Sequence, residues 1–175
     1  YLTTTGLGVR RGPAPSAGRI RAGDVLVTSG PVGDHGAAVL LARGEFGLSG
    51  DVRSDSASVW PLARAALAVP GLRFMRDPTR GGLATVGHEI ARATGLGLRL
   101  VGGDIPVRAP VRTLCELLGY DPLYLACEGR IVAVVAAGDA DGLLAAWRAL
   151  PAGRDAARVG EVVAAAGVVL ATPLG

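Results

Sequence analysis

The sequence of 175 residues contains no lysine, asparagine or glutamine, and all 18 of its basic residues are arginine. The net charge is only +3, the arginines are scattered, and aromatic residues make up 4% of the chain. Domains that bind nucleic acids usually cluster their basic residues and stack bases on aromatic side chains. We therefore expect no nucleic-acid partner.

Long hydrophobic runs are also missing. No apolar stretch reaches the roughly 18 residues that a membrane-spanning helix needs, and the first residues lack the layout of a signal peptide. The two cysteines, Cys115 and Cys127, have a spacing that fits neither a metal site nor a disulfide framework. These absences predict a cytoplasmic protein that does not contact a membrane.

What is present indicates a folded domain, because half of the residues are hydrophobic and the mean hydropathy is positive. Strand-like sequence occupies residues 3–9, 24–30, 72–77, 96–101, 130–136, 157–163 and 167–171. Helix-like sequence occupies residues 37–43, 57–68, 83–93, 109–119 and 140–150. This alternation predicts an α/β (α+β) fold, a mixed β-sheet flanked by helices, with the last two strands paired as a hairpin.

Both ends of the chain lie in strand-like or turn-like sequence, which is typical of a domain taken from a longer polypeptide. We expect residues 1–23 to form a linking strand and loop from a missing N-terminal domain. Residues 24–175 would then form the domain itself.

The stretch RDPTRGGLA, residues 76–84, joins a predicted strand to a predicted helix. The N-terminus of a helix offers unpaired N–H groups and the positive end of the helix dipole, so it binds anions readily. Gly81 and Gly82 would let a phosphate approach the backbone, and Arg76 and Arg80 would neutralise its oxygens. The stretch therefore predicts a phosphate-binding site.

Two further residues of this stretch have alternative roles. Asp77 would hold Mg²⁺ or cap the helix, and Thr79 is a favourable N-cap residue. An ordinary strand–turn–helix junction, with Asp77-Pro78 as its turn, would account for the same residues without any ligand.

The loop at residues 28–40 also joins a strand to a helix, but its glycines do not match the dinucleotide-binding fingerprint. Within it, Asp34 is a natural N-cap, and His35 is either a turn residue or a ligand contact. Asp55 lies in a Ser-Asp-Ser segment just before a predicted helix, where helix capping alone would explain it. Glu128 lies in a turn that leads into the strongest predicted strand, which would hold its carboxylate rigidly; a solvated turn glutamate is the alternative.

The stretch GHEIAR does not predict a zinc protease. The zinc motif needs histidine at both ends of a five-residue span, and here Arg92 stands opposite His88. A metal site rich in histidine is improbable because the chain contains only two histidines.

Taken in order, several segments resemble the HypE family of hydrogenase maturation factors. This family belongs to a superfamily of ATP-using enzymes that includes aminoimidazole ribonucleotide (AIR) synthetase and selenophosphate synthetase. The resemblance extends from Thr3 to Gly175, and the blocks DPTRGG and LLGYDPLYLACEGR are its most specific parts. It also rests on TTTGLG, SGPVGDHGAAVL, RSDSA, TVGHEIA, IPVRAPVRT and GRDAARVGEVV.

The resemblance implies the fold of the C-terminal domain of AIR synthase-related proteins. It implies an enzyme that uses ATP and Mg²⁺ to dehydrate an S-carbamoyl group on its own C-terminal cysteine. The product is a thiocyanate, which supplies the cyanide ligands of [NiFe]-hydrogenase. The implied partners are a carbamoyltransferase and iron-scaffold maturation proteins, and the full-length protein would be a homodimer.

By the same resemblance, Asp77 to Gly82 would face the nucleotide phosphates, with Asp77 on the metal. Glu128 would position or deprotonate the thiocarbamate, and Asp55 and His35 would lie near the same cleft. Cys127 departs from the family, which usually has asparagine at this position.

Ser56 stands where the family often has cysteine, and the family's terminal cysteine tail has no counterpart in this sequence. We expect neither cysteine of the chain to replace the tail thiol, so the fragment alone would be inactive. The alternatives are another ATP-dependent enzyme of the superfamily, or a module that docks partners without chemistry of its own.

Overall fold

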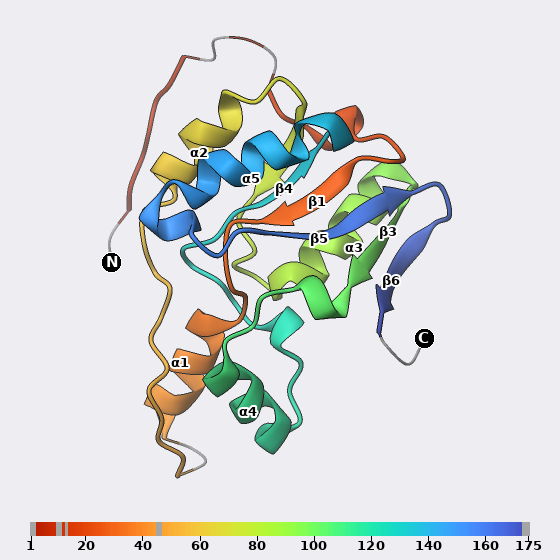
Figure 1. Cartoon of the computed structure of the whole chain (residues 1–175). Coiled ribbons are helices and arrows are strands. Elements are labelled where there is room, and N and C mark those ends of the chain that lie inside the picture. The colour runs from red at the N-terminus through yellow and green to blue at the C-terminus, as the bar shows by residue number, and fades with distance from the viewer. Residues whose placement is uncertain (1–2, 10–11, 13, 45–46, 173–175) are drawn as a thin grey trace.

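The structure is a computed structural model that describes residues 3–9, 12, 14–44 and 47–172 (Figure 1). Its strands are β1 (Val25–Thr28), β2 (Leu72–Arg76), β3 (Gly97–Val101), β4 (Val132–Val135), β5 (Ala157–Val163) and β6 (Gly167–Ala171). Its α-helices are α1 (Asp34–Arg43), α2 (Trp60–Leu67), α3 (Gly82–Thr94), α4 (Ala109–Leu118) and α5 (Ala140–Arg148). Within these described residues, no helix is both long and apolar enough to cross a membrane.

The strands form one sheet in the order β2-β4-β1-β5-β3-β6. Every neighbouring pair is antiparallel except β3 and β6, which are parallel. The predicted α/β class with a mixed sheet is therefore confirmed, and each of the five predicted helices is present within a few residues of its expected bounds.

The predicted hairpin of the last two strands is wrong, because β3 lies between β5 and β6. Gly97, the first residue of β3, pairs with Val163 on one side and with Gly167 on the other. The connection crosses directly over Gly97, where a Cβ atom would collide with the carbonyl oxygens of Ala165 and Gly167. Glycine at position 97 is what allows the crossing, a contact that periodicity along the sequence does not reveal.

The strand predicted at residues 3–9 is also wrong, because this segment is extended but belongs to no strand. Leu7 and Val9 are 102% and 88% exposed. Alternation of apolar residues predicts a strand only where a neighbouring strand offers hydrogen bonds, and no neighbour lies beside this segment in the part of the chain that the structure describes.

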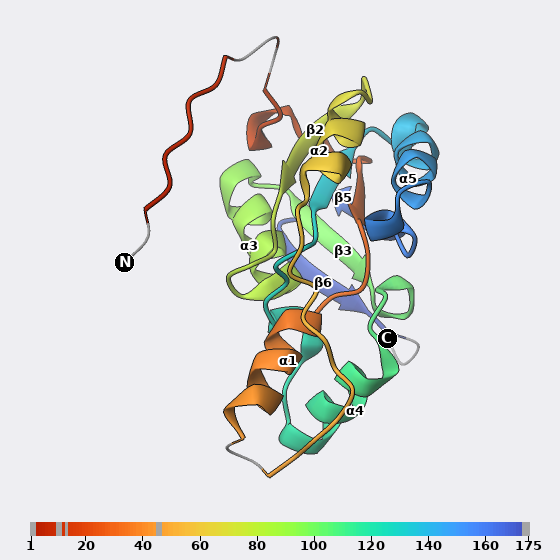
Figure 2. The ribbon, with the colours of Figure 1, turned by 90° about the vertical axis from the view of Figure 1, so that its left-hand side faces the viewer.

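Helices cover both faces of the sheet (Figure 2). In β1, Val25 and Val27 face the side of α2 and α5, and Leu26 faces the side of α3. This alternation is the two-residue period of a strand that is buried on both faces. Trp147 of α5 is fully buried and donates its indole N–H to the carbonyl of Leu62, at 2.9 Å.

Helices α1 and α4 pack on each other beyond one end of the sheet (Figure 1). They enclose a small cluster of their own, made by Ala37, Val111, Leu114 and Cys115. Asp34 is the first residue of α1, and Gly33 is its N-cap, so the prediction of Asp34 as N-cap was wrong. The side chain of Asp34 instead forms ion pairs with Arg108 and Arg130.

Candidate functional site

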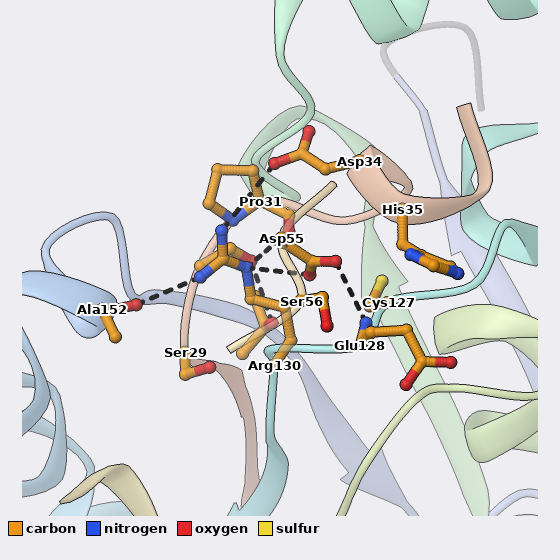
Figure 3. Close-up of polar contacts among 12 residues, drawn as sticks. Ser29, Pro31, Asp34, His35, Asp55, Ser56, Cys127, Glu128, Arg130 and Ala152 are labelled. Atoms are coloured by element: carbon orange, nitrogen blue, oxygen red, sulfur yellow. Dashed lines mark hydrogen bonds and ion pairs between the residues drawn. The ribbon is translucent and has the colours of Figure 1, made fainter. Parts of the chain in front are cut away.

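Four segments meet at one end of the sheet. Thr28, at the end of β1, and Arg76, at the end of β2, both pair with Val132 at the start of β4. The loop after β1, the loop after β2 and the turn before β4 therefore leave the sheet side by side. The segment before α2, which carries Asp55, completes the group (Figure 3).

Asp55 connects this segment to the turn before β4. Its side chain is completely buried, and its Oδ1 accepts a hydrogen bond of 3.0 Å from the backbone N–H of Glu128. The carbonyl oxygen of Asp55 lies so close to Gly129 that a Cβ atom there would collide with it. The Glu128 turn is thus held against Asp55 through both backbone and side chain.

Arg130 lies at the centre of the group and is only 8% exposed. Its Nε donates to the carbonyl of Pro31, at 3.1 Å, and its Nη1 donates to the carbonyl of Ala152, at 3.2 Å. The guanidinium also lies between two carboxylates, with Nε at 3.4 Å from Asp55 Oδ2 and Nη2 at 3.7 Å from Asp34 Oδ2 (Figure 3). One side chain therefore contacts three segments that are far apart in the sequence.

Asp34 completes the charged cluster. Its Oδ2 accepts a hydrogen bond of 2.9 Å from Nε of Arg108, which is largely exposed. Burial raises the pKa of the Asp34 carboxyl above its ordinary value, and the neighbouring charges of Arg108 and Arg130 oppose this rise. Neither Asp34 nor Arg130 was a predicted site residue. A charged residue next to a glycine-containing turn was the only local signal, and its partners lie tens of residues away.

Cys127 is buried beside this cluster. Its Sγ accepts the backbone N–H of Gly33, at 3.3 Å, and lies 3.7 Å from the carbonyl of Leu125. Burial raises the pKa of the thiol to about 12. Since the thiolate is the reactive form, Cys127 is unsuited to carry a carbamoyl group.

The loop after β2 is fastened to the same turn. The N–H of Cys127 donates to the carbonyl of Pro78, and the Thr79 hydroxyl lies 3.2 Å from the carbonyl of Cys127, both contacts joining the two loops. Hydrogen bonding from the side chain of Thr79 also lowers the pKa of the Asp77 carboxyl.

The N-cap predictions for Asp77 and Thr79 were wrong, because Gly81 is the N-cap of α3, with φ of 71°. Glycine has no side chain to accept the N–H groups of the first helical turn, and Gly82, Leu83 and Ala84, which form this turn, are buried. Position 82 requires glycine for a different reason, which is the close approach of other backbone atoms. A Cβ atom there would collide with the carbonyl oxygens of Leu123 and Leu125, so protein backbone fills the space that we expected a phosphate to use.

The two arginines of this loop differ. Arg76 pairs with Glu89 of α3 and donates its Nε to the carbonyl of Asp77, at 2.9 Å. It lines a hollow of about 400 Å³ together with Phe74 and Ile90. Arg80 is exposed and has no carboxylate partner among the described residues. Of the two, Arg80 is the one with its charge still available to a phosphate.

His35 lies in the first turn of α1, with its Nδ1 at 2.9 Å from Oγ of Ser54. The Ser54 hydroxyl in turn accepts the backbone N–H of Ser56, at 3.0 Å. Figure 3 shows His35, Cys127 and Glu128 next to one another at the rim of the charged cluster. The structure thus brings together His35, Asp55, Thr79 and Glu128, and it ties Arg76 to Glu89 instead.

In the loop after β2, residues 77–81, Asp77 is the one carboxylate that could bind a magnesium ion. The described residues contain no group of three or more His, Cys, Asp or Glu side chains arranged to hold a metal. Asp77 is exposed and its carboxylate keeps a lowered pKa. One carboxylate is enough for Mg²⁺ when substrate phosphates and water complete its coordination, so the residues present fit a nucleotide-bound ion and not a metal held by protein alone.

The mixed sheet, the helices on both of its faces and the charged residues in the loops at one of its ends define an α/β domain. Residues 21–172 match the family described as AIR synthase related protein, C-terminal domain. The chain belongs to this family. The corresponding fold prediction is confirmed.

The curated relatives include the carbamoyl dehydratase HypE of Cupriavidus necator, which is 49% identical over 165 residues, or 93% of this chain and 47% of that protein. The HypE of Azotobacter vinelandii is also 49% identical, over 94% of this chain and 49% of that protein. The chain thus spans about half the length of the relatives that it matches. These findings confirm the resemblance to HypE.

Solved structures agree. The crystal structure of Escherichia coli HypE has a TM-score of 0.88 and 44% identity, and the match covers 92% of this chain and 50% of that one. A HypE in complex with ATP has a TM-score of 0.85 and 41% identity, over 93% and 51% of the two chains. A HypE–HypF complex has a TM-score of 0.88 and 35% identity, over 91% and 53%.

Proposed function

We propose that this chain is the C-terminal half of a carbamoyl dehydratase of the HypE type. Residues 1–23 would link it to an N-terminal domain, and residues 24–175 would form the catalytic half described above. The complete protein would convert an S-carbamoyl group on its own C-terminal cysteine to a thiocyanate, for the cyanide ligands of [NiFe]-hydrogenase. The observation that carries the proposal is the 49% identity to a carbamoyl dehydratase over 93% of the chain.

The chemistry assigns a task to Glu128. Dehydration of the carbamoyl group removes two protons from the amide nitrogen and the oxygen from the carbon, so the site needs a base. The Glu128 carboxylate is exposed, on a turn whose backbone is fixed by Asp55 at 3.0 Å. A carboxylate held on a fixed turn can reach the amide protons repeatedly in the same geometry.

ATP supplies the phosphoryl group that makes the amide oxygen a leaving group. The chain would hold the phosphates with the exposed charge of Arg80 and with the backbone around Gly81, the N-cap of α3. Asp77 would contribute the protein ligand of Mg²⁺. His35, oriented by Ser54, would lie on the side of the site opposite this loop, and the buried Asp55 would support the site by holding the Glu128 turn.

The proposal includes partners and location. The HypE–HypF complex is a precedent for association with a carbamoyltransferase, and iron-scaffold maturation proteins would receive the cyanide. The complete protein would act as a homodimer in the cytoplasm. The two alternatives, another enzyme of the superfamily or a docking module, have no observation in their favour.

The test is the intact mass of the complete protein after carbamoylation by its partner, before and after addition of ATP and Mg²⁺. The expected result is the loss of one water from an adduct on the C-terminal cysteine. An adduct that keeps its mass in the presence of ATP would overturn the proposed function.

A further inference from the structure

The position of Arg130 calls for an explanation, because a buried guanidinium is costly unless it is paired and hydrogen-bonded. Arg130 is 8% exposed, and its surroundings hold two buried carboxylates, Asp34 and Asp55. Arg108 adds a second positive charge to Asp34 from the solvent side. Two carboxylates and two guanidinium groups give a cluster with no net charge. Within this cluster, the positive charge that pairs with Asp55 is that of Arg130.

The position of the Asp55 carboxylate determines whether the backbone N–H of Glu128 keeps its hydrogen-bond acceptor. Oδ1 of Asp55 accepts the N–H of Glu128, whereas Oδ2 is buried and accepts no hydrogen bond from any residue that the structure describes. Oδ2 is kept in place by its approach to Nε of Arg130, at 3.4 Å. A buried carboxylate that lost this cation would move toward water, because its desolvation would no longer be offset. The N–H of Glu128 would then lose its acceptor.

We propose that Arg130 is a positioning residue for Glu128 and that it acts through Asp55. Two hydrogen bonds, to the carbonyls of Pro31 and Ala152, hold the guanidinium of Arg130 in place. Its positive charge in turn holds the carboxylate of Asp55 in place. Asp55 in turn orients the first peptide of the Glu128 turn. The role of Glu128 as a base rests on the proposed function, but the chain of contacts from Arg130 to the Glu128 amide does not.

The first readout needs no activity. Amide hydrogen exchange, resolved by residue, is measured in the complete protein and its R130M, D55L and R130K variants. We expect exchange at the Glu128 amide to rise roughly tenfold or more in R130M and in D55L, which has no oxygen to accept the Glu128 N–H. R130K, which keeps a positive charge beside Asp55, retains most of the protection. Unchanged exchange at Glu128 in R130M would overturn the proposal.

The matched control is R148M. Arg148 also donates its Nε to a loop carbonyl, that of Ala156, at 2.9 Å, but it lies on α5 and away from the Glu128 turn. Replacement of Arg148 by methionine should leave the hydrogen exchange of the Glu128 amide unchanged relative to the parent protein. An equal rise in R148M and R130M would show general loosening and would overturn a specific role for Arg130.

The second readout is the dehydration rate, in a double-mutant cycle. R130M and D55L should each lower kcat by roughly tenfold to a hundredfold with little change in KM for ATP, because they misplace the base and leave the phosphate contacts intact. The double variant should be no slower than the slower single one, since both changes break the same chain of contacts. Additive losses would contradict action through Asp55. If the parent protein does not dehydrate the adduct, the proposed function fails, and the exchange measurement still decides the role of Arg130.

Discussion

The carboxylate of Asp55 and the backbone N–H of Glu128 form a hydrogen bond of 3.0 Å, although 73 positions separate the two residues in the sequence. Asp55 lies in an irregular segment before α2, and Glu128 lies in the turn that leads into β4. The contact therefore depends on the whole sheet, which places the ends of β1, β2 and β4 together. It joins the Glu128 turn to the segment before α2, so the position of Glu128 depends on a residue far from it in the sequence.

Replacement of Glu128 by glutamine should slow dehydration by about a hundredfold to ten-thousandfold, because the amide cannot accept the proton that the carboxylate accepts. The measurement is the rate of water loss from the carbamoyl adduct, followed by intact mass. The Glu128 side chain is exposed, so the free energy of unfolding should change by less than about 0.5 kcal/mol. Association with the carbamoyltransferase should be retained.

The control for this variant is E116Q. Glu116 is an exposed glutamate on α4, and the substitution makes the same chemical change outside the site. Dehydration that persists in E128Q while partner association is lost would assign Glu128 to docking and would contradict its role as a base.

Cys127 should resist alkylation in the folded protein. Its pKa is raised to about 12, so at pH 8 only about one thiol in ten thousand is ionised, and burial keeps reagents away. Labelling with iodoacetamide at pH 8, resolved by peptide mass, should modify neither Cys127 nor the buried Cys115 until urea unfolds the chain. Because the folded pKa is raised, the neutral thiol stabilises the fold fully below its ordinary pKa of 9.0, and this contribution is lost as the pH rises toward 12.

Rapid labelling of Cys127 in the folded protein would contradict the buried environment. It would also reopen the question whether this thiol carries a carbamoyl group.

Much of the fold was predictable because the helices and buried strands have clear periodicity. Val25 to Val27 form a continuous apolar run, and the face of α3 that carries Leu83 and Ile90 repeats at helical spacing. The order of the strands was not predictable. The insertion of β3 between β5 and β6 depends on the close crossing at Gly97, which is a tertiary contact.

The site was predictable only in part. Asp55 and Glu128 were found through a resemblance to known proteins, and the structure joins them directly. Arg130 was missed because a buried cation is recognised by its carboxylate partners, and these lie 75 and 96 positions away in the sequence. Arg76 was expected to contact a phosphate, but Glu89 of α3 already neutralises its charge.

Gly82 and Gly95, at the two ends of α3, offer a matched pair of alanine substitutions. Both have positive φ, 61° at Gly82 and 70° at Gly95, so alanine should cost about 1–2 kcal/mol at each through backbone strain. A Cβ atom meets nothing within 4 Å at Gly95 but collides with the backbone of Leu123 and Leu125 at Gly82. Crowding should therefore add about 1–3 kcal/mol in G82A, measured by urea unfolding. Equal costs in the two variants would mean that the segment at residues 123–125 moves aside freely.

Replacement of Thr79 by valine tests the electrostatics of the loop after β2. The side chain of Thr79 is the main cause of the lowered pKa of Asp77, so in T79V this pKa should return toward its ordinary value of 3.8. A carboxyl whose folded pKa is lowered stabilises the fold above its unfolded pKa, and this contribution is lost as the pH falls through the folded value. T79V should therefore be less stable than the parent protein at neutral pH, and the difference should narrow below pH 3.8. The pKa is measured from the carboxyl ¹³C shift of Asp77, with T113V, on the exposed face of α4, as the control. An Asp77 pKa that stays lowered in T79V would assign the effect to the backbone N–H groups of the loop and to Arg76 instead.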